Sequence, residues 1–133
     1  MSVVHDKAGL PARVMVIDDE KIVCDMARLS LEQEGYVVET FLSARPALER
    51  LEKERFDVIV TDYKMKDIDG LGVLKTVKRL YPETEVIIIT AFANLDAAIE
   101  ALRGDAFDFF PKPVKIKDLK ESIKRALSKR HDR

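Results

Sequence analysis

The sequence predicts an α/β protein in which a parallel sheet is covered by helices on both faces. Five short strand-like runs alternate with stretches of helical periodicity along the 133 residues. The runs are apolar throughout, which is typical of parallel strands buried on both faces. The expected strands are Arg13–Ile17, Val37–Phe41, Asp57–Thr61, Glu85–Thr90 and Ala106–Phe110.

The stretch after the first strand predicts a helix. Ile22, Met26, Leu29 and Gln33 recur at intervals of three or four residues and therefore lie along one stripe. Gly35 follows this stripe and is a suitable C′ residue, because glycine readily adopts the left-handed conformation that often ends a helix.

The four later helices are indicated by residues that start or stop helices. Ser43 can cap the second helix, and Pro46 then falls in its first turn, where a missing N–H costs little. Pro82 stops the third helix, Asn94 can cap the fourth, and Gly104 ends it. The apolar positions that mark these helices are Ala47, Leu48 and Leu51; Leu71, Leu74, Val77 and Leu80; Ala97, Ala98, Ala101 and Leu102; and Ile116, Leu119, Ile123 and Leu127.

The composition indicates a single cytoplasmic domain. Hydrophobic residues make up 47% of the chain and charged residues 35%, as in ordinary globular proteins. The net charge of −1 gives no overall field that would attract nucleic acid. Cys24 is the only cysteine, and a buried structural thiol is expected there, with a reactive thiol as the alternative. No apolar run approaches the ~20 residues that span a bilayer, and the N-terminus lacks the apolar segment of a signal peptide.

Polar side chains stand at the carboxyl ends of four of the five strand-like runs. Asp18 and Asp19 follow the first run, Asp62 follows the third, Thr90 ends the fourth, and Lys112 comes just after the fifth. Carboxyl ends of parallel strands meet along one edge of a sheet, where open α/β sheets bind ligands. Three acids, a hydroxyl and an ammonium on that edge form a site for a divalent metal and a phosphoryl group.

Each of these residues also has an ordinary structural explanation. An Asp pair between a strand and a helix, such as Asp18–Asp19, is more often an N-cap than a metal ligand. Asp62 could belong to a polar turn, Thr90 could simply end a strand, and Lys112 could be a solvated loop charge. Their joint position on one edge of the sheet favours a functional site.

The chemistry of these side chains favours a magnesium or manganese ion. Three carboxylates within a few ångströms repel one another unless a cation lies among them. Oxygen ligands without nearby His or Cys suit Mg²⁺ or Mn²⁺ better than zinc, and Mg²⁺ readily takes phosphate oxygens as further ligands. An Asp in this position can act as a nucleophile and form an aspartyl phosphate. Lys112 and Thr90 would hold the remaining phosphoryl oxygens.

Four motifs resemble those of the receiver domain of two-component response regulators. They are Val16–Glu20, Thr61–Gly70, Ile89–Ala91 and Phe110–Pro113. The resemblance implies a flavodoxin-like, doubly wound, five-stranded parallel sheet with strand order 2-1-3-4-5 and helices on both faces. It covers nearly the whole chain and implies a receiver domain over residues 12–129. Residues 1–11 are then a flexible lead, and residues 130–133 are a tail or the beginning of a linker.

The resemblance implies an acceptor and a set of metal ligands. Asp62 corresponds to the phosphoacceptor. Asp19 would bind the metal directly and Asp18 would hold it through water. The backbone carbonyl of Lys64, two residues after the acceptor, would be a further ligand.

The resemblance also implies the residues of a switch. Thr90 corresponds to the switch hydroxyl and Lys112 to the cation that pairs with the phosphoryl group. Ala91 matches the small residue that leaves room for phosphate, and Phe109 matches the aromatic that rotates inward on activation. Lys112-Pro113 corresponds to a cis peptide of the family, and without the family Phe109 could equally be a core aromatic.

Three positions depart from the usual family pattern. Lys66 stands where proline is usual, which could loosen the loop but removes no ligand. Lys64 stands where Asn or another polar residue is common, so its ammonium could reach the phosphoryl oxygens, obstruct water or point to solvent. Phe109 replaces the usual Tyr and therefore lacks a hydroxyl.

The resemblance implies signalling partners rather than conventional enzyme activity. A sensor histidine kinase or a histidine phosphotransfer protein would donate the phosphoryl group, and the domain would catalyse its own phosphorylation and dephosphorylation. The fourth helix, fifth strand and fifth helix would form the surface that contacts an output domain, a partner or a second copy. Ala101, Leu102, Phe109 and residues 115–124 are expected to contribute to it. No membrane contact or direct nucleic-acid binding is expected of this domain, although an attached output domain could bind DNA.

Two other functions remain open on the sequence alone. A pseudo-receiver would act only through protein contacts, but the complete set of acidic, hydroxyl and basic residues counts against it. A phosphohydrolase with an Asp nucleophile would need a second acid two residues later, where this chain has Lys64.

Overall fold

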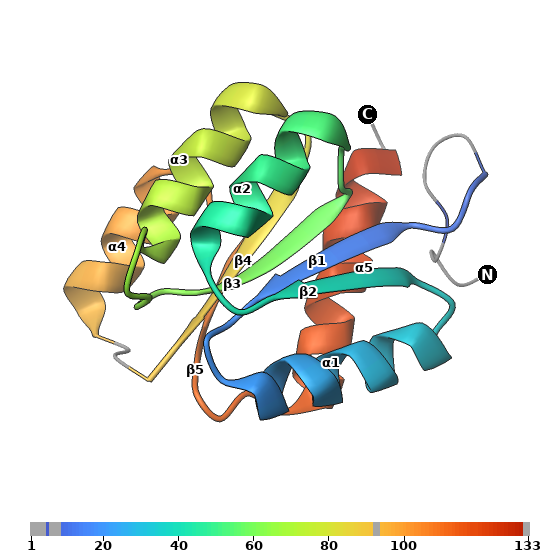
Figure 1. Cartoon of the computed structure of the whole chain (residues 1–133), viewed down its shortest axis with the longest axis horizontal. Helices are drawn as coiled ribbons and strands as arrows, with labels where there is room; N and C mark the ends of the chain where they lie inside the picture. Colours follow the sequence, from blue (N-terminus) through green and yellow to red (C-terminus); the bar gives the residue numbers. More distant parts are fainter. Residues whose placement is uncertain (1–4, 6–8, 92–93, 132–133) are drawn as a thin grey trace.

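The computed structural model describes residue 5 and residues 9–91 and 94–131. Five parallel strands form one sheet in the order β2-β1-β3-β4-β5, which confirms the predicted fold class and strand order (Figure 1). The strands are β1 (Arg13–Ile17), β2 (Val37–Phe41), β3 (Val58–Asp62), β4 (Glu85–Thr90) and β5 (Asp108–Pro111).

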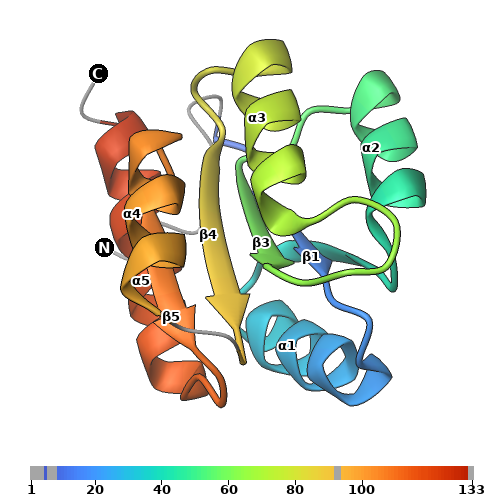
Figure 2. The ribbon, with the colours of Figure 1, turned by 90° about the vertical axis from the view of Figure 1, so that its left-hand side faces the viewer.

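Helices cover both faces of the sheet. They are α1 (Lys21–Gln33), α2 (Ala44–Lys53), α3 (Gly70–Leu80), α4 (Leu95–Arg103) and α5 (Ile116–His131). α1 and α5 lie on one face, and α2, α3 and α4 lie on the other (Figures 1 and 2). Every strand is therefore enclosed in the three-layer arrangement expected of a doubly wound sheet.

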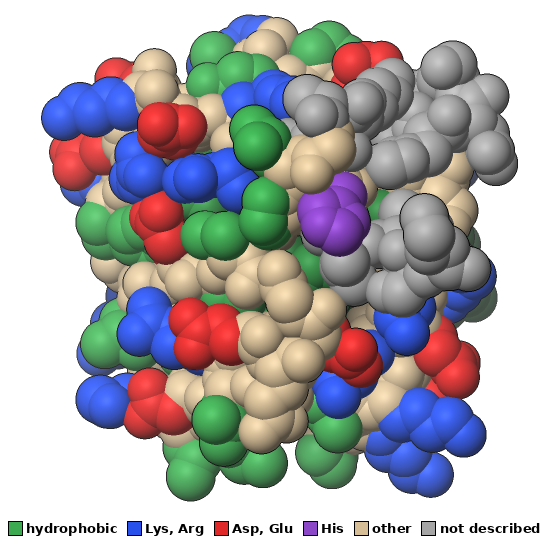
Figure 3. All heavy atoms as spheres, turned by 90° about the vertical axis from the view of Figure 1, so that its right-hand side faces the viewer, with side chains coloured by type: hydrophobic (Ala, Val, Ile, Leu, Met, Phe, Trp, Pro, Cys, Tyr) green, Lys and Arg blue, Asp and Glu red, His purple; other side chains and the backbone are tan. Residues whose placement is uncertain are grey.

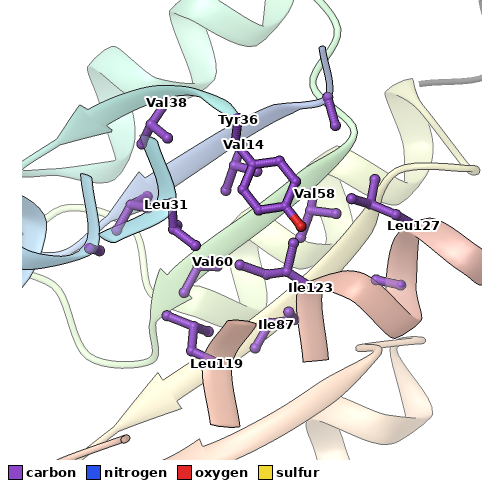
Figure 4. Packing of buried hydrophobic residues seen from close by; sticks show 14 of the residues in the cluster. Val14, Leu31, Tyr36, Val38, Val58, Val60, Ile87, Leu119, Ile123 and Leu127 are labelled. Atoms are coloured by element: carbon purple, nitrogen blue, oxygen red, sulfur yellow. The ribbon is translucent and has the colours of Figure 1, made fainter. Parts of the chain in front are cut away.

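Each face of the sheet contributes to its own hydrophobic core. In β1, Val14 and Val16 pack with α1 and α5, whereas Met15 and Ile17 pack with α2, α3 and α4. Successive side chains of a strand point to opposite faces, which explains this division. The first core also contains the ring of Tyr36 beside side chains from both helices (Figure 4). Its labelled members are Val14, Leu31, Tyr36, Val38, Val58, Val60, Ile87, Leu119, Ile123 and Leu127.

Two strands differ in their bounds from the expectation. β3 is shifted by one residue and includes Asp62 as its last member, because Asp62 pairs with Ile89 of β4. β5 begins at Asp108 rather than Ala106 and extends to Pro111, which pairs with Thr90. With these bounds Asp62 is the last residue of β3, and Lys112 directly follows β5.

Helix α1 exists as predicted, but the stripe that predicted it faces solvent. Ile22, Met26 and Leu29 are 67%, 63% and 62% exposed. The buried face consists of Cys24, Ala27 and Leu31. Small side chains on that face let the helix approach the sheet closely, and they carry less of a hydrophobic signal than the large exposed residues. Burial raises the pKa of the Cys24 thiol to about 11, as expected for a structural cysteine.

The expected residues occupy the helix ends, but one of them, Ser43, makes no capping hydrogen bond. The Asn94 side chain accepts a hydrogen bond of 2.8 Å from the N–H of Ala97. Gly35 has φ of +100°, the left-handed conformation predicted for it. Ser43 occupies the N-cap of α2, but its side chain makes no capping hydrogen bond. Asp67, from the loop after β3, supplies that interaction.

The face at the amino ends of the strands mixes acidic and basic side chains (Figure 3). The buried carboxylate of Glu85 forms ion pairs of 3.2 Å with Lys78 and 3.3 Å with Lys129. These pairs attach α3 and α5 to the beginning of β4. In the part of the chain that the structure describes, no helix has the length and apolar character required to cross a membrane.

The predicted N-terminal lead lies mostly outside the described residues. Residues 1–4 and 6–8 of the lead lie outside the described residues, and so do residues 132–133 of the predicted tail. His5 forms an isolated antiparallel bridge with Pro11. Ala12, where the domain was predicted to begin, is fully buried in the core.

Candidate functional site

The strand register gathers the predicted residues along the carboxyl edge of the sheet. Ile17 pairs with Thr61, so the residues that follow them in the chain, Asp18 and Asp62, lie side by side. Thr90 is the last residue of β4 and is fully buried. The backbone N–H of Lys112 donates a 2.7 Å hydrogen bond to the carbonyl of Thr90 and holds the loop after β5 at this edge.

Lys112 is the central charge of the site. Its ammonium lies 2.8 Å from Glu20 Oε1, 2.9 Å from Asp18 Oδ2 and 3.2 Å from Asp62 Oδ2. Asp18 and Asp62 are buried, and the Lys112 side chain is 14% exposed. Sequence reasoning missed Glu20 as a partner. The signal was present in the acidic triplet at positions 18–20, which directly follows β1.

Burial and neighbouring charge set the protonation of these groups. Burial, and then the nearby Asp18 carboxylate, raise the pKa of Asp62 above its usual value, although Lys112 acts in the opposite direction. Burial alone would lower the pKa of Lys112, but Glu20, Asp18 and Asp62 outweigh it and raise the pKa. Lys112 therefore stays charged and offsets the repulsion between two buried carboxylates.

The acidic residues fit a hard divalent cation. Asp18, Asp19 and Glu20 each offer a carboxylate oxygen, and these oxygens lie within 4.8 Å of one another. Asp18 also shares Lys112 with Asp62, which brings the acceptor into the same cluster. A set made only of oxygen donors with a net negative charge suits Mg²⁺ or Mn²⁺ rather than a softer metal.

The loop after Asp62 is bonded to the sheet at Tyr63 and closed by a hydrogen bond between its two ends. The N–H of Tyr63 donates to the carbonyl of Ile89 at 2.9 Å, and the N–H of Gly70 donates to the carbonyl of Tyr63 at 2.8 Å. The backbone N–H of Lys64 bonds to the Asp62 carboxyl and lowers its pKa. Both predicted contributors from this loop, Asp62 and Lys64, therefore belong to one hydrogen-bonded turn.

A contact between Tyr63 and Phe109 joins this loop to β5. The two rings meet edge to face, with centroids 6.5 Å apart and planes at 68°. Phe109 is half-buried and packs against the core between the sheet and α2, α3 and α4. Burial, followed by the charges of Glu100 and Asp69, raises the pKa of Tyr63, so its hydroxyl stays neutral. Sequence reasoning did not predict this contact because the two residues are far apart in the chain.

The remaining predicted residues lie around the same edge. Ala91 follows Thr90 and is exposed, and the Lys112-Pro113 peptide bond is cis. A groove of about 570 Å³ opens between α1 and α5, with Ala91, Glu20 and Lys112 on its wall. The prediction is wrong for four residues of the expected contact surface, which are buried instead of facing outward: Ala101, Leu119, Ser122 and Ile123.

Comparison with known proteins identifies the class of protein. Residues 14–124 match the sequence profile of the response regulator receiver domain. The chain is 38% identical over 115 residues to the DNA-binding transcriptional regulator NtrC of Proteus hauseri, covering 86% of the chain and 24% of that protein. It is 34% identical over 118 residues to the transcriptional regulatory protein ZraR of Escherichia coli K12, covering 89% of the chain and 27% of that protein.

Solved structures agree with this identification. A receiver domain protein from Methanospirillum hungatei JF-1 has a TM-score of 0.87 and 31% identity, over 91% of this chain and 97% of that one. The beryllofluoride-activated NtrC4 receiver domain dimer has a TM-score of 0.85 and 33% identity, over 89% of this chain and 98% of that one.

The chain belongs to the response regulator receiver family. It is a signalling domain of the two-component type, and receiver domains are in general not conventional enzymes. They generally bind Mg²⁺ at an acidic pocket, and this chain has an acidic cluster at positions 18–20. Response regulators receive their signal from histidine kinases. The chain spans about a quarter of the length of the curated relatives that it matches.

Proposed function

We propose that this domain accepts a phosphoryl group on Asp62 and transmits the change to the surface formed by α4, β5 and α5. The single observation that carries this proposal is the contact of Lys112 with both Asp62 and Asp18, at 3.2 and 2.9 Å. A buried carboxylate beside a second acid and a fixed cation is poised to exchange its cation partner when phosphorylated. A pseudo-receiver would have no use for such an arrangement.

The phosphoryl transfer takes place between a nucleophile and a phosphoryl donor. An oxygen of the Asp62 carboxylate attacks the donor phosphorus, the P–N bond of a phosphohistidine breaks, and the released imidazole takes a proton. Hydrolysis later adds water to the phosphorus and returns Asp62 as a carboxylate with inorganic phosphate. The domain thus catalyses its own phosphorylation and dephosphorylation.

When bound, a divalent ion such as Mg²⁺ or Mn²⁺ would neutralise part of the phosphoryl charge. Asp19 and Asp62 would hold it directly, with Asp18 through water and the Lys64 carbonyl as a further ligand. Lys112 and the Thr90 hydroxyl would hold phosphoryl oxygens, and Ala91 leaves space beside them. The convergence of oxygen donors at positions 18–20 supports this placement.

The conformational change on phosphorylation would be transmitted from Lys112 and Thr90 to Phe109. Lys112 directly follows β5, and Thr90 pairs with the last residue of β5. Phe109 lies on β5 against Tyr63. On α4, Leu95 and Leu102 are 74% and 57% exposed, so this surface offers apolar area to a second copy or an output domain. The NtrC4 receiver, which forms a dimer, is similar to this chain and supports the homodimer.

The physiological setting follows from the relatives. Their names describe transcriptional regulators, so we place this receiver, over residues 12–129, in control of a transcriptional output in the cytoplasm. The donor would be a sensor histidine kinase or a histidine phosphotransfer protein. The domain itself would contact neither membrane nor nucleic acid.

The acceptor can be tested with a small phosphoryl donor. Incubation with acetyl phosphate and Mg²⁺ should add one phosphoryl mass to the protein, and Asp62→Asn should abolish the addition because its amide is not a nucleophile. Intact mass spectrometry measures both. Unchanged phosphorylation of Asp62→Asn would refute the acceptor, and no phosphorylation of the wild type by acetyl phosphate or a kinase would favour a pseudo-receiver.

Lys64 should prolong the life of the phosphorylated state. An ammonium near the phosphoryl oxygens stabilises their charge, and its side chain can block the approach of water. Lys64→Asn should therefore speed dephosphorylation, measured as the decay of phosphorylated protein at equal Mg²⁺. Lys66→Asn is the matched control, since Lys66 is also an exposed lysine of the same loop. Equal or slower decay in Lys64→Asn would show that Lys64 does not act on hydrolysis.

A further inference from the structure

The loop between β3 and α3 carries the acceptor's neighbour Lys64, and its middle part needs a support of its own. Its two ends are fixed, by Tyr63 to β4 and by the Asp69 side chain, which accepts a 2.9 Å hydrogen bond from Gly72 at the start of α3. Between them lies Lys66. Proline would fix the backbone φ at this position, whereas lysine does not.

Asp67 provides a cross-link at that point. Its Oδ2 accepts a 2.7 Å hydrogen bond from the N–H of Arg45, and its Oδ1 accepts one of 3.2 Å from the N–H of Ala44. Both donors belong to the first turn of α2, more than twenty residues earlier in the chain. Figure 2 shows the loop after β3 extending toward the start of α2.

The chemistry of α2 favours this cross-link. The first N–H groups of a helix have no partner within the helix, and a negative charge near them is stabilised by the helix dipole. Ser43, the N-cap residue, leaves these groups to another acceptor because its side chain makes no capping bond. Burial would raise the pKa of Asp67, but the N–H groups of Arg45, Ile68 and Ala44 outweigh it and lower the pKa.

We infer that Asp67 is a positioning residue that fixes the acceptor loop against α2 and so holds the Lys64 carbonyl ready for the divalent ion. It would supply stiffness that the backbone of Lys66 does not provide. This inference rests on the proposed function, because it assumes that the ion binds beside Asp62. Asp67 itself touches neither the ion nor the phosphoryl group.

The test compares Mg²⁺ affinity in the whole chain, measured by calorimetry and by NMR shifts of the backbone amides of residues 62–65. Asp67→Ala should weaken Mg²⁺ binding about tenfold, the usual effect of losing a residue that orients a metal ligand. Adding Lys66→Pro to Asp67→Ala should restore most of the affinity, because proline stiffens the same segment.

Thr84→Val is the control for a general loss of stability. The Thr84 hydroxyl donates a 2.6 Å hydrogen bond to the carbonyl of Phe56 at the opposite edge of the sheet, far from the loop. This variant should bind Mg²⁺ like the wild type. Wild-type affinity in Asp67→Ala, an equal loss in Thr84→Val, or no recovery with Lys66→Pro would each overturn the inference.

Two measurements, Mg²⁺ affinity of Asp67→Ala and phosphorylation on Asp62, distinguish a failure of this inference from a failure of the proposed function. If wild-type protein is phosphorylated on Asp62 while Asp67→Ala keeps full Mg²⁺ affinity, only the inference fails. If Asp62→Asn does not change phosphorylation, the proposed acceptor is wrong and the inference falls with it. A loss of affinity in Asp67→Ala together with Asp62-dependent phosphorylation supports both.

Discussion

Lys112→Ala is expected to destabilise the metal-free protein strongly, by about 3 kcal/mol, at the lower end for removing one partner of a buried ion pair. The Lys112 ammonium contacts Asp18, Asp62 and Glu20 within 3.2 Å. Without it, two buried carboxylates repel each other with no cation between them. Urea unfolding followed by circular dichroism, with EDTA present, measures the change in the free energy of unfolding.

Mg²⁺ and a second substitution distinguish charge repulsion from a loss of packing. Saturating Mg²⁺ should return much of the lost stability to Lys112→Ala, because a ligand that binds only the native state stabilises it. Asp62→Asn should also rescue the variant by removing one carboxylate. Lys21→Ala is the control, since Lys21 pairs with Asp25 at 2.8 Å but is 76% exposed, and it should change stability little. Equal losses in both lysine variants would contradict the electrostatic explanation.

The same variant separates phosphorylation from its consequence. Lys112→Ala should still accept a phosphoryl group on Asp62, because the nucleophile remains. It should fail to change the NMR spectrum of α4, β5 and α5, because no cation moves from the resting carboxylates to the phosphoryl group. A normal activated spectrum in phosphorylated Lys112→Ala would rule out this coupling.

Local sequence patterns predicted the elements that depend on local physics. β1, β2 and β4 have the expected bounds, and β1 and β4 are almost continuously buried runs. The order of the strands came from the resemblance to the receiver family, not from these runs. The polar positions at the carboxyl edge were identifiable because a parallel sheet brings all strand ends of one sense together.

Side-chain partners across the chain could not be predicted in the same way. Residues Ile22, Met26 and Leu29 predicted the right helix through a face that proved to be exposed, because periodicity reports a helix without saying which side is buried. The role of Asp67 at the start of α2 depends on tertiary structure, because its two N–H donors are more than twenty residues away in the chain. Glu20 likewise becomes a partner of Lys112 only when the loop after β5 folds over β1.

Gly70→Ala is expected to reduce stability by about 1–3 kcal/mol or more, as overpacking of a buried position does. A Cβ at Gly70 would lie 2.6 Å from the carbonyl oxygen of Asp62 and 2.9 Å from the Cα of Tyr63. Both are backbone atoms of the acceptor segment, so relief requires that this segment or the start of α3 move. The variant should therefore also be phosphorylated more slowly by acetyl phosphate than the wild type.

Gly72→Ala is the matched control for Gly70→Ala, because both residues lie in the first turn of α3. A Cβ at Gly72 would meet the Cγ2 atom of Ile68 at 2.6 Å, so the Ile68 side chain must shift while the backbone of the acceptor segment can stay in place. Alanine gains up to about 1 kcal/mol of helix propensity over glycine, which offsets part of that cost. Gly72→Ala should thus lose less stability than Gly70→Ala and keep a phosphorylation rate near that of the wild type. Urea unfolding and timed mass spectrometry distinguish the two variants. If Gly70→Ala matched Gly72→Ala in both measurements, close approach of α3 to the Asp62 carbonyl would not be what requires glycine at position 70.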